Sequence, residues 1–362
     1  DLVRSRGLGD VYKRQHPMLW MTHCYYLLQR AEMLYESETM NKANRSCEKI
    51  NSGNKINAEA RIIYARYLNL KGRTNDAIHE VELALSVNPR NSEAYDLLAQ
   101  MQQAQGNTLL AEHTLLKAIT FQPGYWRPFR RLALFQFKNS RYNDAAKNYK
   151  KVIELSPKSG RAWSDFGAAH LMAGNLNEAA DAFNRAVQLE PNQAGYSNLG
   201  TLYYYLGRYN DAIRHYQLAL KDSPNDYRLY GNIADVYRQQ QRSEESHRYY
   251  QQALSLQESY TASTVADIDS QSLSLLYRYY LGVLPNAYED MLSLINQYPE
   301  NAELQLYAAI MAKPQSDNGK VILHLEKAIS LGLSGVLISV DPDFSYLGSE
   351  PRFTRLVAAS VH

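Results

Sequence analysis

The sequence predicts an all-α fold, a right-handed α-solenoid (superhelix) of about nine two-helix units. The repeat behind this prediction is clearest in one row of prolines: Pro89, Pro123, Pro157, Pro191 and Pro224. These prolines are spaced by 34, 34, 34 and 33 residues. A period of this length is typical of solenoids, in which each unit buries its apolar face only against its neighbours.

Small and large residues recur in the same register as the prolines. One row of alanines consists of Ala77, Ala111, Ala145, Ala179 and Ala212. A row of large residues begins successive units: Tyr95, Phe129, Trp163, Tyr196 and Tyr230. Small side chains let two helices approach closely, and the large ones fill the space beside them. Because several residue classes share one register, the repeat is a strong signal.

Two amphipathic helices are expected in each unit, with apolar residues at positions i, i+3, i+4 and i+7. Gly72 and Gly174 stand five residues before an alanine of the row and suit the turn between the two helices. Glycine adopts the left-handed conformation of such a turn at little cost. The repeating proline ends the second helix because it has no backbone N–H to donate.

Residues 1–15 share no pattern with the rest of the chain. They resemble the translation of a sequencing-library adapter, and a disordered native N-terminus is the alternative. On either interpretation we expect the protein to extend upstream of His16.

The register divides the remainder of the chain into five parts. Residues 16–57 are predicted to form a degenerate N-terminal helix pair, and residues 58–258 form six clear units. The insertion at residues 259–267 is rich in serine and threonine and predicts a longer loop, a helix extension or a break. Residues 268–335 are predicted to form two degenerate units, and residues 336–362 a C-terminal capping segment.

The repeated positions resemble those of the tetratricopeptide repeat, whose pattern is Trp-x2-Leu-Gly-x2-Tyr, then Ala-x3-Phe, then Pro. The closest matches combine Trp163, Phe166, Gly167, Ala179, Phe183 and Pro191 in one unit, and Tyr196, Leu199, Gly200, Tyr203, Ala212, Tyr216 and Pro224 in the next. The resemblance implies a superhelix whose concave face, lined by the first helix of each unit, binds peptides. It therefore implies a protein–protein interaction scaffold.

Charge and hydropathy exclude several other classes. Lys and Arg number 39 and Asp and Glu 37, so the chain has no strongly basic character that would attract nucleic acid. No apolar run reaches the length of about 18 residues that a membrane-spanning helix needs. We therefore expect neither a nucleic-acid partner nor a membrane span within this segment.

Catalytic and cofactor motifs are absent from the sequence. It contains no phosphate-binding loop, no dinucleotide-binding glycine pattern after a strand and no His-Glu-x-x-His. Cys24 and Cys47 have no metal-ligand spacing, and we expect them to be buried small residues. The alternative is that Cys24 and Cys47 face each other across one helix pair. The prediction is that the chain is not an enzyme and holds no cofactor or metal.

The resemblance places the ligand on the concave face, at positions on the first helices. These positions carry Arg127, Arg130, Arg131, Arg161, Asn198, Thr201, Tyr204, Asn232 and Arg238. Arginine and asparagine side chains can grip a peptide backbone or a carboxylate. The expected partner is thus a protein or peptide, acidic or ending in a free carboxylate. Ordinary solvated helix faces are the alternative of equal weight.

The C-terminal region narrows the resemblance. Asp341-Pro-Asp-Phe-Ser-Tyr-Leu347 and Ser349-Glu-Pro-Arg-Phe353 resemble the ending of bacterial chains that join a serine/threonine kinase or a winged-helix domain to tetratricopeptide repeats. This implies the sensory part of a larger signalling protein, either cytoplasmic or periplasmic, and tethered if a membrane helix precedes it. A free-standing adaptor and the repeat portion of a glycosyltransferase are the alternatives.

Overall fold

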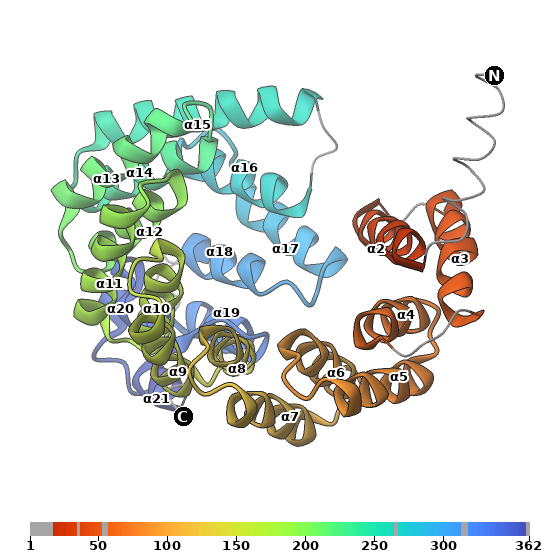
Figure 1. Cartoon of the computed structure of the whole chain (residues 1–362). Coiled ribbons are helices and arrows are strands. Elements are labelled where there is room, and N and C mark those ends of the chain that lie inside the picture. The colour runs from red at the N-terminus through yellow and green to blue at the C-terminus, as the bar shows by residue number, and fades with distance from the viewer. Residues whose placement is uncertain (1–16, 35–36, 53–56, 264–266, 313–317, 360–362) are drawn as a thin grey trace. The chain divides into compact units, whose positions relative to one another are not determined.

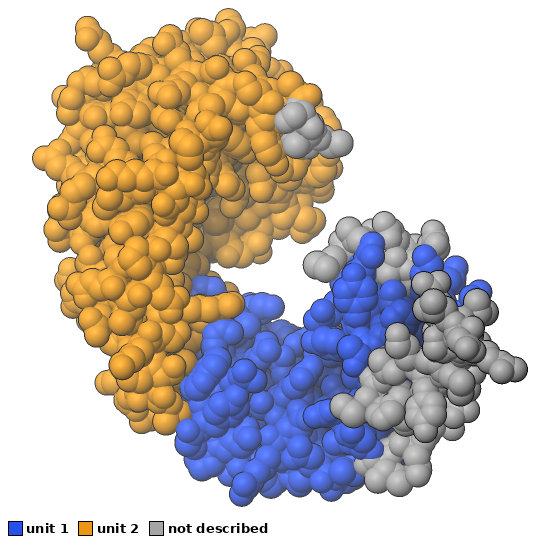
Figure 2. Space-filling view, turned by 45° about the horizontal axis from the view of Figure 1, so that its top comes forward, with its two compact units in different colours: residues 1–139 blue, residues 140–362 orange. Residues whose placement is uncertain are grey.

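The structure, a computed structural model, describes residues 17–34, 37–52, 57–263, 267–312 and 318–359. Residues 1–15, for which an adapter-derived origin was expected, lie outside this range. All regular secondary structure in the described residues is helical, which confirms the predicted all-α fold (Figure 1). The chain divides into two compact units, residues 1–139 and 140–362, called here unit 1 and unit 2 (Figure 2).

Unit 1 consists of helices that pack in consecutive pairs. They are α2 (Pro17–Leu34), α3 (Ser37–Ser52), α4 (Ala58–Leu70), α5 (Thr74–Val87), α6 (Ser92–Ala104), α7 (Thr108–Phe121) and α8 (Trp126–Lys138). The helices α4, α6 and α8 are the first helices of successive repeats. Pro89 precedes α6, and Pro123 precedes α8.

Unit 2 continues the same pattern and ends in three short elements. Its helices are α9 (Tyr142–Leu155), α10 (Gly160–Met172), α11 (Leu176–Leu189), α12 (Gln193–Tyr205), α13 (Tyr209–Asp222), α14 (Tyr227–Gln239), α15 (Ser243–Ser263), α16 (Ile268–Tyr280), α17 (Ala287–Gln297), α18 (Ala302–Ala312), α19 (Asn318–Ser330), α20 (Gly335–Val340), the 3-10 helix η2 (Pro342–Leu347) and α21 (Pro351–Ala359). Of the insertion at 259–267, residues 259–263 extend α15, and 264–266 lie outside the described residues.

Glycines in the repeat register serve either the turn or the close helix approach that the sequence analysis expects of small residues. Gly72 and Gly174 have φ values of 74° and 82°, as the turn between paired helices requires. Gly200 instead lies inside α12, where a Cβ would come within 2.5 Å of the Tyr216 ring on α13. Close approach of paired helices therefore depends on the missing side chain at this position.

Six of the described first helices have a start signal that the repeat pattern alone does not show, whereas α8 begins after Tyr125 without a side-chain cap. The side-chain oxygen of the residue before the helix accepts a hydrogen bond from a backbone N–H of the first turn. That N–H has no acceptor within the helix itself. The capping residues are Asn57, Asn91, Ser159, Asn192, Asp226 and Asp267. These caps fix where the six helices begin.

Cys24 of α2 and Cys47 of α3 form a disulfide, with their Cα atoms 5.1 Å apart. Both are fully buried, as expected, but the expectation of two separate small residues was wrong. The pairing of α2 with α3 places the two side chains opposite each other, which was the alternative.

The C-terminal elements cover the last helix pair. Phe344, Leu347 and Phe353 are buried with Val321 and Leu325 of α19 in one apolar cluster. The same segment turns back toward earlier repeats, because α20 packs against α10. This return path brings acidic side chains of η2 to α14.

Candidate functional site

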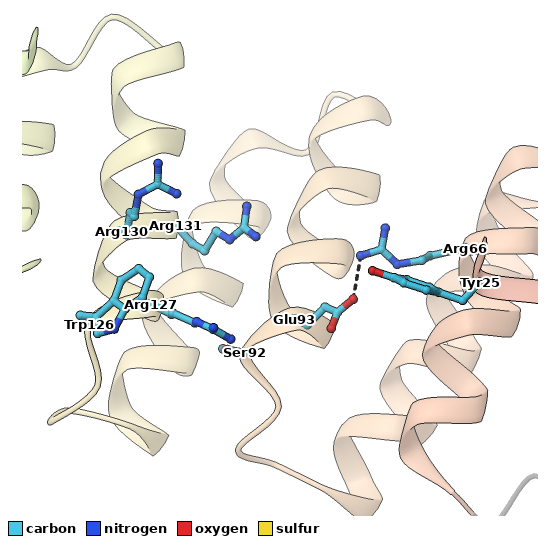
Figure 3. A pocket seen from close by; sticks show the side chains of 8 residues that line it. All are labelled: Tyr25, Arg66, Ser92, Glu93, Trp126, Arg127, Arg130 and Arg131. Carbon is cyan, nitrogen blue, oxygen red and sulfur yellow. Dashed lines mark hydrogen bonds and ion pairs between the residues drawn. The ribbon is translucent and has the colours of Figure 1, made fainter. Parts of the chain in front are cut away.

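An arginine-rich pocket lies on the first helices of unit 1. It has a volume of about 300 Å³ and is called here the arginine pocket (Figure 3). Its lining residues are Tyr25, Arg66, Ser92, Glu93, Trp126, Arg127, Arg130 and Arg131. They come from α2, α4, α6 and α8, so three of the nine predicted site residues converge here.

Ion pairs hold some of these arginines in place. Arg66 Nη2 lies 2.9 Å from Glu93 Oε1, and Arg131 Nη1 lies 3.1 Å from Asp96 Oδ2. The Arg127 guanidinium lies 5.5 Å from the centre of the Trp126 ring, within the range of a cation–π contact. The lining of the pocket therefore contains four guanidinium groups and one carboxylate, and its charge is positive.

Helix periodicity explains this clustering. Arg127, Arg130 and Arg131 stand at i, i+3 and i+4 of α8, and such positions share one helix face. The opposite face of α8 carries Leu132 and Phe135, which are buried in the core. Burial of that apolar face turns the arginines toward the pocket.

Arg161 lies in a different pocket, in unit 2. This pocket of about 320 Å³ is also lined by Ser164 and Glu190. Glu190 Oε1 accepts a hydrogen bond of 2.8 Å from the backbone N–H of Gly160. A carboxylate thus stands beside Arg161, and the positive charge expected at this position is offset.

Asn198 and Asn232 line a larger pocket of unit 2, with a volume of about 750 Å³. We call it the carboxylate pocket, because its charged lining residues are Asp226, Asp267, Asp269 and Glu303 together with Arg228. The expected amides are present, but the expected basic character is not. The acidic residues come from the caps of α14 and α16, from α16 itself and from α18. Asp267, Asp269 and Glu303 lie after Arg238, the last of the predicted site residues, so the predicted positions did not include them.

Thr201 and Tyr204 take part in internal contacts of unit 2. The hydroxyls of Thr201 and Tyr216 lie 3.0 Å apart, and Tyr204 Oη accepts a hydrogen bond of 3.4 Å from Gln239 Nε2. Burial raises the pKa of Tyr204 well above its ordinary value, and nearby aspartates raise it further. These two residues hold helices of the array together.

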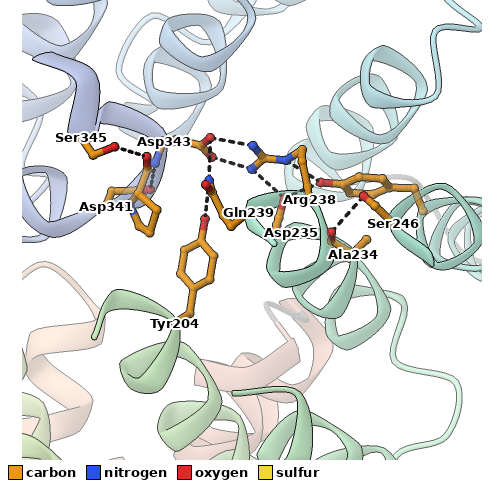
Figure 4. Close-up of polar contacts among 11 residues, drawn as sticks. Tyr204, Ala234, Asp235, Arg238, Gln239, Ser246, Asp341, Asp343 and Ser345 are labelled. Carbon is orange, nitrogen blue, oxygen red and sulfur yellow. Dashed lines mark hydrogen bonds and ion pairs between the residues drawn. The ribbon is translucent and has the colours of Figure 1, made fainter. Parts of the chain in front are cut away.

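Arg238 is bound by the protein's own C-terminal segment (Figure 4). Its guanidinium donates two hydrogen bonds of 2.7 Å to the two carboxylate oxygens of Asp343. Its Nε also donates a hydrogen bond of 3.2 Å to Tyr250 Oη, and its Nη2 lies 3.3 Å from Asp235 Oδ1. The face of the guanidinium lies over the Tyr280 ring at 4.5 Å. Arg238 therefore does not present its guanidinium to a partner, contrary to the expectation.

The return of the C-terminal segment is the feature that sequence reasoning missed. Gln239 Nε2 donates a further hydrogen bond of 3.1 Å to Asp343 Oδ1. Burial raises the pKa of Asp341 to about 7, with the Asp343 carboxylate as the next cause. The acidic segment Asp341-Pro-Asp343 could have predicted this contact, because its negative charge is complementary to that of an arginine on a first helix.

The described residues contain no group of three or more His, Cys, Asp or Glu side chains arranged to hold a metal ion. Among the described helices, none has both the length and the apolar character that crossing a bilayer requires.

The chain was also compared with known proteins. Two models of the tetratricopeptide-repeat family match residues 136–202 and 194–259. The search of curated proteins finds no match.

Several solved structures of low sequence identity have a similar fold. MamA is 24% identical over 49% of this chain and 96% of its own, with a TM-score of 0.44. The Cut9–Hcn1 complex is 16% identical over 89% of this chain and 59% of its own, with a TM-score of 0.47. YrrB, described as having an unusual peptide-binding site, is 15% identical over 49% of this chain and 92% of its own, with a TM-score of 0.43. Residues 136–259 of the chain are therefore similar to tetratricopeptide repeats.

Proposed function

We propose that this chain is a protein–protein interaction scaffold that binds an acidic, extended segment of a partner protein in the arginine pocket. The observation that carries the proposal is the charge of the pocket lining, with four arginines against the single carboxylate of Glu93. Guanidinium groups bind carboxylates through paired hydrogen bonds, which are stronger than hydrogen bonds between neutral groups.

The shape of the pocket suits side chains rather than a whole small molecule. A volume of about 300 Å³ is at the lower end for ligand sites, and two or three side chains of an extended peptide fill it. Trp126 offers an aromatic surface beside the arginines. A glutamate or aspartate side chain, or a C-terminal carboxylate, supplies the negative charge.

Unit 2 provides an internal example of the same recognition. Asp343, in the chain's own 3-10 helix η2, is held by Arg238 of the first helix α14 through two hydrogen bonds of 2.7 Å. An acidic segment at a first-helix arginine is therefore a contact that this fold accommodates. We propose the equivalent contact, made by a partner, for Arg127 and Arg130.

We further propose that this binding serves the regulatory part of a larger bacterial signalling protein. The support is the resemblance carried by Asp341–Leu347 and Ser349–Phe353. Sequencing the source locus upstream of the His16 codon tests this. A kinase or winged-helix domain there is expected, and a start codon or signal peptide directly upstream would favour the free-standing adaptor.

The pocket itself is tested with a fluorescein-labelled peptide amide of alternating glutamate and alanine. Its affinity is measured by fluorescence polarisation at low salt, for the wild type and for the double variant Arg127→Gln/Arg130→Gln. Loss of two charge-assisted contacts predicts at least about tenfold weaker binding, since about 1.4 kcal/mol corresponds to a factor of ten.

The matched control is Arg90→Gln, because Arg90 is an exposed arginine of unit 1 that does not line the pocket. This variant removes one positive charge and is expected to bind the peptide like the wild type. Equal affinity of the double variant and the wild type would refute the proposal. A comparison of the amide with the same peptide ending in a free carboxylate tells whether a side chain or the chain end is preferred.

A further inference from the structure

The carboxylate pocket of unit 2 differs in charge from the arginine pocket and has no role in the function proposed above. Its acidic lining residues come from α16, α18 and the segments before α14 and α16. Tyrosines contribute much of the remaining wall, namely Tyr227, Tyr260, Tyr277 and Tyr307. All of these elements belong to unit 2, so the pocket is formed within one compact body.

We propose that the carboxylate pocket is a second binding site, which receives a lysine side chain from a basic segment of a partner protein. Its carboxylates accept hydrogen bonds from the ammonium group, and its tyrosine rings contact the aliphatic stem and the cation. This combination of acidic and aromatic groups is how proteins bind ammonium groups.

Two of the four carboxylates are already engaged within the protein. Asp226 caps α14 and pairs with Arg228 at 3.0 Å, and Asp267 caps α16 by accepting the Ser270 N–H. The side chains of Asp269 and Glu303 accept no hydrogen bond from any residue that the structure describes, so they remain to bind a cation.

Asp269 and Glu303 act on each other through their charges. Burial raises the pKa of Glu303, and the neighbouring Asp269 carboxylate raises it further. A cation placed between them relieves this repulsion. Binding of a lysine is therefore favoured over the empty state by electrostatics as well as by hydrogen bonds.

Tyr277 is a further feature of the pocket that suits a polar ligand. The residue is only 2% exposed, and it lines the pocket. Its hydroxyl lies over Gly231 of α14 and shares no hydrogen bond with any residue that the structure describes. A donor or acceptor of a ligand in the pocket supplies that missing partner.

Metal binding is a weaker explanation of the same residues. The described part of the chain has no three acidic, histidine or cysteine side chains close enough to share an ion. A volume of about 750 Å³ is also far larger than a metal ion needs, whereas it accommodates lysine together with neighbouring residues of a peptide.

The test uses a fluorescein-labelled, N-acetylated peptide amide of alternating lysine and alanine, with the full chain in fluorescence polarisation at low salt. We expect the double variant Asp269→Asn/Glu303→Gln to bind at least about tenfold more weakly than the wild type. Tyr277→Phe keeps the ring and removes the hydroxyl, and we expect a smaller loss of a few-fold.

The control Asp222→Asn removes a charge from an exposed residue at the end of α13 that does not line the pocket, and it is expected to bind like the wild type. The Arg127→Gln/Arg130→Gln variant should also keep its affinity for the lysine peptide, which separates this site from the arginine pocket. Unchanged binding by Asp269→Asn/Glu303→Gln, or an equal loss with Asp222→Asn, would overturn the proposal.

Discussion

Arg238 and Asp343 are 105 positions apart in the chain, yet they form a two-pronged ion pair with both hydrogen bonds at 2.7 Å. The contact joins α14, in the middle of the repeat array, to η2 in the C-terminal segment. The Asp343 side chain is 7% exposed and that of Arg238 is 23% exposed. The C-terminal segment is therefore held by charge as well as by the apolar cluster around Phe344.

Removal of one partner of this pair should destabilise unit 2. We expect Asp343→Ala to lower the free energy of unfolding by about 3 kcal/mol, because it leaves the largely buried Arg238 guanidinium without its main acceptor. The measurement is urea unfolding, with hydrogen exchange to locate the effect in α20 to α21. The double variant Arg238→Met/Asp343→Leu should recover much of the loss, since it removes both charges. No change in exchange at η2 with Asp343→Ala would contradict this account.

The stability of the same region should depend on pH through Asp341. Its pKa in the folded protein is raised to about 7 by burial first and by Asp343 second, with Asp235 adding to the rise and Arg238 opposing it. An unfolded aspartate has a pKa of about 3.9. The folded state therefore binds the Asp341 proton more tightly than the unfolded state does. The stabilisation that comes from this difference is fully present below about pH 4, and it is lost as the pH rises to about 7.

Asp341→Asn tests this dependence, because asparagine keeps the side-chain oxygen that accepts the Asp343 N–H but cannot ionise. We expect the variant to be more stable than the wild type at pH 8 and similar to it at pH 4. Melting temperatures measured over this range give the comparison. Parallel pH profiles for the two proteins would show that Asp341 is not the responsible group.

Two glycines should respond differently to the same substitution. At Gly106, with φ of 81° and no atom within 4 Å of an added Cβ, Gly106→Ala meets only backbone strain of about 1 kcal/mol. At Gly200 the added Cβ meets the Tyr216 ring at 2.5 Å, and Gly200→Ala should cost clearly more, about 2–3 kcal/mol. Urea unfolding of the two variants measures the difference. Equal losses would mean that the α12–α13 crossing adjusts without cost.

Reduction of the disulfide should loosen the N-terminal helix pair. Cys24 and Cys47 are separated by 23 positions, and closing a loop of that length in the unfolded chain stabilises by about 3 kcal/mol in the chain-entropy view. We expect faster hydrogen exchange in α2 and α3 with a reductant, and the same increase in Cys24→Ser/Cys47→Ser without one. Exchange that does not change on reduction would show that packing alone holds this pair.

Much of the fold follows from the sequence by itself. The turn glycines, the alanines and the repeating prolines act locally or between neighbouring repeats, so their register predicts helix pairs and their stacking. The clustering of Arg127, Arg130 and Arg131 is equally local, because i, i+3 and i+4 positions of one helix share a face. These arginines were therefore found from the sequence, and they line one pocket.

Contacts between distant segments were decided only by the tertiary structure. Arg238 is also a first-helix residue, but the return of the C-terminal segment places Asp343 against it, and no repeat register encodes that path. Asn198 and Asn232 likewise line a pocket together with carboxylates such as Glu303 that come from helices later in the chain. Periodicity specifies which face a side chain lies on, whereas its electrostatic surroundings depend on whatever segment the fold brings to that face.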